Sequence, residues 1–239
     1  MISFKLGLAS KIIKVTCFDE FSKEYCKDFI VDEAIKEDFE VKITKEDLIK
    51  EKELECNKGA YGSVELSAMY RKIVTRLALD NTLLFHCSAI CYNGKAYCFA
   101  AHSGVGKSTH VRLLMEAIGK DKISYINDDK PLFKFDGDKI EVYGTPWNGK
   151  ERKSLNVDYP LGGIALLSRG KENSISQIEG KAAYNRILEQ IYLPPSKLEL
   201  ISVLGLIDKL LTSAPIYELK ANMDLSAGIT SFKAMMERN

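Results

Sequence analysis

One short stretch of the chain has the residue types and spacing of a phosphate-binding loop. It reads AHSGVGKSTH, residues 101–110. Gly104 and Gly106 let the backbone turn closely, so that its N–H groups can point at phosphate oxygens. Lys107 would place a cation on the β- and γ-phosphates, and Ser108 offers a hydroxyl to Mg²⁺. The predicted nucleotide-binding residues are Ser103, Gly104, Val105, Gly106, Lys107, Ser108 and Thr109.

The first position of this loop departs from the usual pattern G-x-x-x-x-G-K-[ST], because Ala101 stands where a glycine is usual. That glycine mainly eases the exit from the preceding strand, so a small alanine is expected to permit the loop. How far it weakens nucleotide binding stays open at this point. The alternative, an accidental glycine-rich turn, is disfavoured because the apolar run KAYCFAA precedes the loop and an amphipathic helix follows it.

Two adjacent carboxylates, Asp128 and Asp129, follow the predicted strand KISYIN. The carboxyl ends of strands are where α/β sheets gather their chemistry. One carboxylate there can hold Mg²⁺ through water, and the other can act as a base toward an incoming hydroxyl. The alternative is an Asx-turn or helix-capping pair on a solvated loop.

Three further residues are candidates with open alternatives. His86 lies in the apolar run TLLFHCSAICY, where it is either a core residue or a catalytic group. The segment YGTPWNGKER, residues 143–152, carries Lys150 and Arg152, which could clamp a phosphate or an acidic substrate. A solvated turn anchored by Trp147 explains this segment equally well.

The six cysteines show no C-x-x-C pair. A zinc site formed by Cys87, Cys91 and Cys98 with His86 is conceivable, but its spacing is unusual. Small buried hydrophobes in a reducing compartment are the favoured interpretation.

The elements that must position these groups follow from hydrophobic periodicity and turn signals. Asn93-Gly94 predicts a type I′ hairpin between two strands, and a second hairpin is predicted to turn at Asp136-Gly137. The expected helices are 66–80, 107–118, 180–192, 196–213 and 224–237, and the expected strands are 82–92, 95–101, 122–127, 132–143 (a hairpin), 161–169 and 215–220. This alternation predicts an α/β fold with a mixed sheet. We expect a small α+β region over residues 1–62 and a catalytic domain over 63–239.

Composition excludes several classes of protein. The 239 residues carry 34 Lys+Arg against 33 Asp+Glu, so bulk charge indicates no nucleic-acid or membrane partner. No apolar run reaches the roughly 18 residues of a membrane-spanning helix. The N-terminus lacks a signal-peptide core. A cytoplasmic protein is expected.

These residues resemble a known family. The set Phe85-His86-x-Ser88, Ser103-Gly104-x-Gly106-Lys107-Ser108-Thr109 and Asp128-Asp129 is similar to the catalytic domain of HPr kinase/phosphorylase. The loop is also similar to that of ATP-dependent phosphoenolpyruvate carboxykinase. The resemblance covers about residues 80–225 and extends to NDDKPLF, YGTPWNGK and NMD, which small bacterial HPr-kinase-like proteins carry in similar places.

The resemblance implies a Mg-ATP-dependent kinase that transfers the γ-phosphoryl group to a hydroxyl, on a peptide or protein serine or on a small molecule. It also allows a homo-oligomer. The implied roles are Lys107 on the phosphates, Ser108 and Asp129 on Mg²⁺, Asp128 as general base, His86 beside the transferred phosphate, and Lys150 and Arg152 on the substrate.

Departures from the family leave other functions open. The segment PLGGIALLSRG lacks the paired acidic and basic residues of the HPr kinase signature, and Arg169 is the one candidate there. The substrate-binding arginines of the carboxykinase have no counterpart. A non-catalytic ATP-binding accessory or sensor protein is therefore the alternative, and a motion-coupled ATP hydrolase is a third reading. Residues 1–60 could bind a peptide by strand addition or only cap the sheet.

Overall fold

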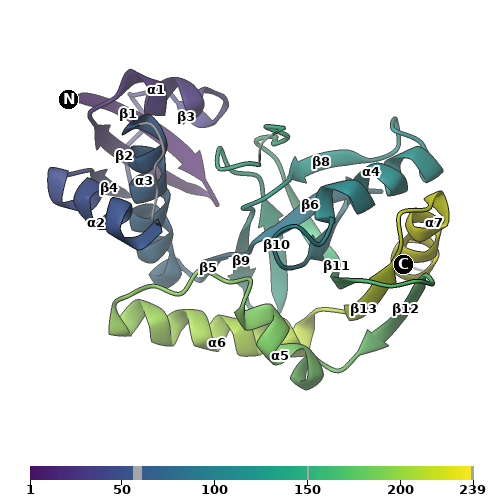
Figure 1. Ribbon diagram of the computed structural model, residues 1–239. Helices are drawn as coiled ribbons and strands as arrows, with labels where there is room; N and C mark the ends of the chain where they lie inside the picture. The colour runs from purple at the N-terminus through teal and green to yellow at the C-terminus, as the bar shows by residue number, and fades with distance from the viewer. Residues whose placement is uncertain (56–60, 150, 238–239) are drawn as a thin grey trace.

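The computed structural model describes residues 1–55, 61–149 and 151–237 (Figure 1). Its N-terminal part contains a four-stranded sheet within the described residues, in the order β3-β1-β2-β4. β1 and β2 form an antiparallel hairpin, and β4 pairs parallel to β2. The elements of this part are β1 Ile2–Leu8, β2 Lys11–Cys17, α1 Glu20–Tyr25, β3 Ile30–Val31, β4 Phe39–Lys42, α2 Lys45–Glu55 and α3 Tyr61–Leu77.

The helix α3 closes the core of this N-terminal part. Its apolar residues recur at helical spacing, so Met69, Ile73 and Leu77 share one buried face. They belong to the same core cluster as Phe4 and Val15 of the sheet. A short 3-10 turn, Ala78–Asp80, then leads into β5. The helix spans the predicted boundary between residues 62 and 63, and the division into two domains stays a prediction.

The rest of the chain forms a mixed sheet that has nine strands in the described residues. The strands are β5 Thr82–Leu84, β6 Cys87–Tyr92, β7 Lys95–Ala100, β8 Ser124–Asn127, β9 Leu132–Asp136, β10 Lys139–Tyr143, β11 Asp158–Arg169, β12 Ser174–Ile178 and β13 Ile216–Ala221. Their order is β5-β9-β10-β11-β7-β6-β8, and β13 adds to β11 and carries β12. β11 pairs parallel to β7 and to β13, whereas the other pairs of this sheet are antiparallel. The predicted α/β fold with a mixed sheet is confirmed.

Helices cover both faces of this sheet because its central strands are apolar on both sides. Ile164 and Leu166 of β11 pack with α5 Gly180–Leu188 and α6 Lys197–Ser213. Ala165 and Leu167 pack with α4 Lys107–Ile118 and α7 Leu225–Met235. α4 and α7 approach closely at Gly228, where a Cβ would lie 2.6 Å from the Cα of Leu114.

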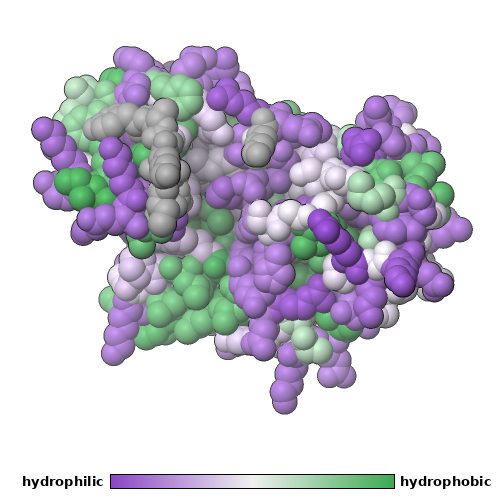
Figure 2. Space-filling model, viewed as in Figure 1, coloured by the Kyte–Doolittle hydropathy of each residue, from purple (hydrophilic) through white to green (hydrophobic). Residues whose placement is uncertain are grey.

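The outer face of α6 carries exposed apolar side chains. Leu198 is 71% exposed and Ile201 is 57% exposed, and this area is green in Figure 2. Within the part of the chain that the structure describes, no helix combines the length and apolarity needed to cross a membrane.

The predicted hairpins form, with one shift of register. Asn93 and Gly94 have φ of 48° and 73°, and they connect the paired residues Tyr92 and Lys95, as a type I′ turn requires. In the second hairpin Asp136 pairs with Lys139. The turn therefore consists of residues 137 and 138, one position later than predicted.

The prediction of a single strand over residues 82–92 is wrong. The chain leaves β5 at Leu84 and begins β6 at Cys87. Between them, Phe85 N–H donates to the Pro131 carbonyl at 3.2 Å and His86 N–H donates to the Gln190 carbonyl at 2.7 Å. β5 pairs with β9, whereas β6 pairs with β7 and β8. The apolar run is thus divided into two strands with different partners. A further strand, β12, was not predicted and pairs with β13.

Candidate active site

The glycine-rich loop connects β7 to α4, as its sequence predicts. Gly104 and Gly106 have φ of 79° and 124°, which side chains rarely tolerate. A Cβ at either position would meet no atom within 4 Å, so the space beside the loop is open. Gly106 is the N-cap of α4 and makes no side-chain capping bond, which leaves the first N–H groups of the helix for another acceptor. This arrangement fits an anion such as phosphate.

Ala101 causes no strain in the loop. Its φ is not positive, so a glycine is not required there. The residue is only 6% exposed and belongs to the core cluster between the sheet and α4. The alanine therefore provides buried apolar contact at a position where the backbone does not need a glycine.

The side chain of Lys107 leads from the loop to His86 and Asp129. Lys107 Nζ lies 3.0 Å from His86 Nε2 and 3.3 Å from the Ala101 carbonyl oxygen. His86 Nε2 lies 3.1 Å from Asp129 Oδ1. The break between β5 and β6 places His86 here rather than in a continuous strand. His86 is partly exposed and is not part of the apolar core cluster, and its catalytic role stays a prediction.

The ionisation of this cluster follows from its contacts. Burial alone would raise the pKa of Asp129, but its hydrogen bond with His86 and the charge of Lys130 outweigh burial and hold the pKa below its usual value. Lys130 also forms an ion pair with Asp129. Burial lowers the pKa of Lys107, and the nearby Asp129 carboxylate opposes this shift. Asp129 is therefore an anion that can attract a cation.

Asp128 has a different environment although it is the adjacent residue. It is 7% exposed, and its Oδ1 accepts a hydrogen bond from the Gly149 N–H at 2.6 Å. Burial raises the pKa of Asp128, and the bond from Gly149 opposes the shift. A Cβ at Gly149 would lie 3.0 Å from Asp128 Oδ2, so the glycine permits this close approach. The pKa values of the two carboxylates thus shift in opposite directions, as is typical of acid–base pairs.

Asn127 holds the two carboxylates in place, a role that was not predicted. Its Oδ1 accepts from the backbone N–H groups of Asp129 at 2.8 Å and Lys130 at 2.6 Å. Its Nδ2 donates to the Thr145 carbonyl at 3.0 Å and to the Trp147 carbonyl at 3.3 Å. The Asx-turn considered for the aspartates is therefore made by Asn127, and the sequence NDD carries that signal.

The segment 143–152 is fixed to the N-terminal part of the chain. Trp147 is 4% exposed, belongs to the core cluster of that part, and lies 5.9 Å from the Tyr70 ring. The guanidinium of Arg152 lies 4.7 Å from the Tyr25 ring centroid, and Tyr25 Oη donates to Asn148 Oδ1 at 2.9 Å. Arg152 lines a cavity of about 120 Å³ there.

The substrate roles predicted for the two cations of this segment stay predictions. Arg152 has the contacts just given, and they lie on the side of the N-terminal part rather than at the glycine-rich loop. Lys150 lies outside the described residues. The anchoring of the turn by Trp147, which the alternative required, is observed.

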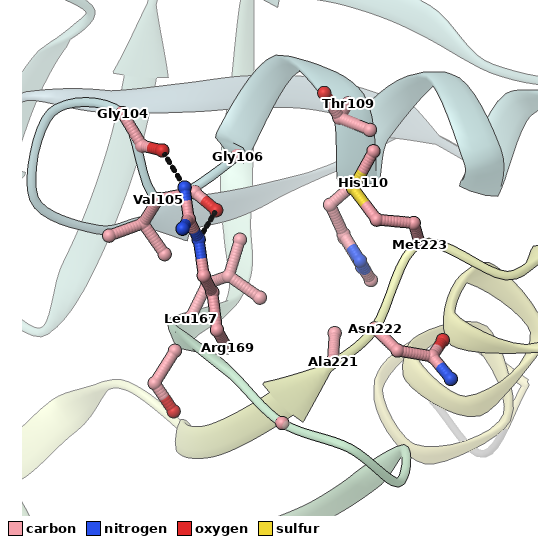
Figure 3. Close-up of a pocket in the computed structure, with 12 residues that line it drawn as sticks. Gly104, Val105, Gly106, Thr109, His110, Leu167, Arg169, Ala221, Asn222 and Met223 are labelled. Atoms are coloured by element: carbon pink, nitrogen blue, oxygen red, sulfur yellow. Dashed lines mark hydrogen bonds between the residues drawn. The ribbon is translucent and has the colours of Figure 1, made fainter.

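A cavity of about 530 Å³ lies beside the glycine-rich loop (Figure 3). Arg169, at the end of β11, extends to the loop: its Nη2 donates to the Gly104 carbonyl at 2.7 Å, and its Nε donates to the Val105 carbonyl at 3.4 Å. This arginine therefore braces the loop, a contact that the sequence did not predict. Thr109, a predicted nucleotide-binding residue, lines the same cavity.

The cysteines of the zinc alternative lie on β6 and β7. Cys87, Cys91 and Cys98 are buried and free. Among the described residues, no group of three or more histidine, cysteine or acidic side chains is arranged to hold a metal ion. The two predicted metal ligands differ in exposure. Ser108 is exposed in the first turn of α4, whereas Asp129, which follows Asp128, is partly buried.

Comparisons with known proteins give likenesses among solved structures. No family model matches the chain, and no curated protein matches it. Among solved structures, the HPr(Ser) kinase/phosphatase from Coxiella burnetii aligns with 65% of this chain and 97% of its own, at 9% identity and a TM-score of 0.37. This likeness concerns the fold alone.

Proposed function

We propose that this protein is a Mg-ATP-dependent kinase of the HPr-kinase-like type, which transfers the γ-phosphoryl group to a hydroxyl of a peptide serine or a small molecule. The observation that carries the proposal is the connected cluster from the glycine-rich loop to the paired carboxylates. Lys107 Nζ contacts His86 Nε2 at 3.0 Å, and His86 contacts Asp129 at 3.1 Å.

The residues present fit a magnesium ion bound with a nucleotide. Mg²⁺ in such sites takes one or two protein oxygens and completes its shell with water and phosphate oxygens. The exposed hydroxyl of Ser108 and the anionic carboxylate of Asp129 are oxygens of the required kind. When bound, the ion would neutralise charge on the β- and γ-phosphates.

The chain's own groups would act mainly by position and charge. The N–H groups at the start of α4 would bind phosphate oxygens, and the ammonium of Lys107 would turn from His86 to the phosphates. Asp128 would accept the proton of the acceptor hydroxyl. The hydroxyl oxygen then bonds to the γ-phosphorus, the bond from that phosphorus to the bridging oxygen breaks, and ADP leaves with the electron pair.

The backbone around Asp128 supports its role as the base. Its Oδ1 is held by Gly149 N–H, while its backbone N–H donates to the Lys153 carbonyl at 3.0 Å and its carbonyl accepts from Ser88 Oγ at 3.1 Å. A carboxylate fixed in this way keeps one orientation toward the substrate, which favours proton transfer.

The test is ³¹P NMR of the protein with Mg-ATP, alone and with serine-bearing peptides, free serine and small polyols. A new phosphoester resonance that grows together with ADP is expected for one class of acceptor. ATP resonances that broaden and persist against the whole panel would instead support the nucleotide-binding sensor. An unchanged ATP spectrum would contradict both.

A further inference from the structure

The cavity of about 530 Å³ lies beside the glycine-rich loop. It is lined by the loop at Gly104–Gly106, by Thr109 and His110 of α4, by the end of β11 and by Ala221–Met223. His86, Lys107, Asp128 and Asp129 are not among its lining residues. The cavity and the proposed transfer site are therefore lined by different residues.

His110 is a buried polar side chain that lines the cavity. It is only 3% exposed, and its imidazole extends from α4 toward Ala221 and Asn222 (Figure 3). Its Nδ1 is buried and has no hydrogen-bond partner in the described part of the chain. Buried polar atoms nearly always have a partner, so this exception needs an explanation.

The hydrogen bonds on the other side of the ring fix its tautomer. His110 Nε2 lies 3.0 Å from Ser231 Oγ, and Ser231 Oγ lies 3.0 Å from the Gly228 carbonyl. A carbonyl only accepts, so the serine hydroxyl donates its one proton to Gly228. Ser231 Oγ must then accept from Nε2–H of His110. Nδ1 consequently carries a lone pair, and it needs a donor.

Part of the cavity lining suits a flat apolar ring. Leu167 and Val105 contribute branched side chains, and Met223, which is 72% exposed, is a flexible and polarisable side chain at the rim. The volume lies within the usual range for small-molecule sites, about 300–1,000 Å³. The lining also includes the polar residues Thr109, Ser168, Arg169 and Asn222. A mixture of apolar walls and a few placed polar groups is typical of small-molecule sites.

The direction of a bound nucleotide follows from the loop. Lys107 extends to His86 on one flank, so the γ-phosphate end belongs there. A chain of phosphates that crosses the start of α4 would pass Thr109, which lines the cavity. The nucleoside end is therefore directed to the cavity.

We propose that this cavity holds the nucleobase, and that His110 Nδ1 accepts a hydrogen bond from an exocyclic amino group, which selects a 6-aminopurine over a 6-oxopurine. The proposal rests on the nucleotide site of the proposed function. In an inosine nucleotide an oxygen replaces the amino group, so two acceptors would face each other without a proton between them.

The test is calorimetric binding of Mg-ATP, Mg-ITP and Mg-tripolyphosphate to the unaltered protein and to His110→Phe, with Lys95→Ala as control. Lys95 does not line the cavity and is exposed at the start of β7, the end of that strand away from the loop. The unaltered protein and the control should bind ATP roughly ten- to a hundredfold more tightly than ITP. His110→Phe should bind the two nucleotides alike and bind tripolyphosphate as the unaltered protein does.

Each contrary result has its own meaning. If the unaltered protein binds ATP and ITP within twofold, or binds ATP no more tightly than tripolyphosphate, the base site is wrong while the proposed kinase stands. If neither ATP nor tripolyphosphate binds, both proposals are wrong. The comparison of ATP with ITP needs no variant, so a folding defect in His110→Phe leaves it decisive.

Discussion

One nitrogen of His86 faces two partners with opposite needs: Lys107 Nζ at 3.0 Å and Asp129 Oδ1 at 3.1 Å both contact Nε2. A charged lysine donates to a lone pair, whereas a carboxylate accepts a proton. Nε2 has one or the other, so only one of the two contacts is a full hydrogen bond at a time. A phosphate that draws Lys107 away would leave Nε2–H to Asp129, which couples phosphate binding to the orientation of the carboxylate.

Lys107→Ala is expected to weaken Mg-ATP binding. Loss of one charge-assisted hydrogen bond is worth about 1.5–3 kcal/mol, or roughly ten- to a hundredfold in Kd. Titration calorimetry would measure this change. Lys95→Ala is the matched control, because Lys95 is exposed at the end of the β6–β7 hairpin. Equal affinities for the two variants would exclude Lys107 from the phosphate site.

Asp128→Asn is expected to slow transfer and leave nucleotide binding intact. The amide keeps an oxygen that can accept from Gly149 N–H, so the local fold is retained, but it cannot take a proton. We expect kcat to fall by about 10²–10⁴, measured as ADP release with the acceptor found by NMR. Asp136→Asn, at the exposed end of β9, is the control. Full activity in Asp128→Asn would remove the base from the mechanism.

Two glycine substitutions should have opposite effects. Gly106→Ala introduces a Cβ at φ 124° and should lower the free energy of unfolding by about 1–2 kcal/mol, with weaker Mg-ATP binding. Gly205 lies within α6, where an added Cβ would meet no atom within 4 Å. Gly205→Ala should therefore raise the free energy of unfolding by about 0.5–1 kcal/mol. Urea unfolding of both variants tests this, and a Gly106→Ala protein of unchanged stability would refute the strain at the loop.

His110 should make stability depend on pH. Burial lowers the pKa of His110 from 6.5 to about 4. Above the pKa of the unfolded chain, His110 is neutral in both the folded and the unfolded state. As the pH falls, the unfolded chain takes up the proton first, so stability is lost between about pH 6.5 and pH 4. At pH 5 the free energy of unfolding is lower by about 2 kcal/mol because of His110.

The measurement is urea unfolding at pH 7 and pH 5. His110→Asn should lose about 2 kcal/mol less than the unaltered protein over this interval. His102→Gln, at an exposed site, should keep the full loss. If all three proteins lose the same unfolding free energy between pH 7 and pH 5, His110 does not remain neutral in the fold.

Trp147 should connect the segment 143–152 to the stability of the N-terminal part. It is the single tryptophan of the chain and is 4% exposed. Trp147→Ala should cost about 3–5 kcal/mol through the cavity it leaves, measured by circular dichroism in urea. Leu155→Ala, at a 48% exposed residue, should change stability by less than about 0.5 kcal/mol. A mild effect of Trp147→Ala would mean that the segment is not anchored there.

Local signals in the sequence were sufficient for the elements that carry the loop. Asn93-Gly94 predicted its hairpin because a type I′ turn needs positive φ at two successive residues, and few residue pairs adopt this as readily as Asn-Gly. The start of α4 was predicted because Gly106-Lys107-Ser108 is at once a helix start and an anion cradle. Asp128 and Asp129 were placed correctly after a strand, which the structure shows over Ser124–Asn127.

Features that depend on distant partners were not predicted. The break at His86 arises because β5 and β6 pair with different strands, and periodicity within one apolar run contains no such information. The contact of Arg169 with Gly104 spans 65 residues. The assignment of a lone pair to His110 Nδ1 depends on Ser231 and Gly228 of α7, which are distant in the sequence and contact His110 only in the folded chain.

The parallel position of β11 between β7 and β13 also bears on the order of folding. The β1–β2 hairpin joins neighbouring residues and can form while the chain is still being synthesised. The brace from Arg169 and the wall at Ala221–Met223 require long-range closure, which is slow. A nascent chain that ends before β13 would have the glycine-rich loop without one side of its cavity, so the proposed nucleotide site is expected to form last.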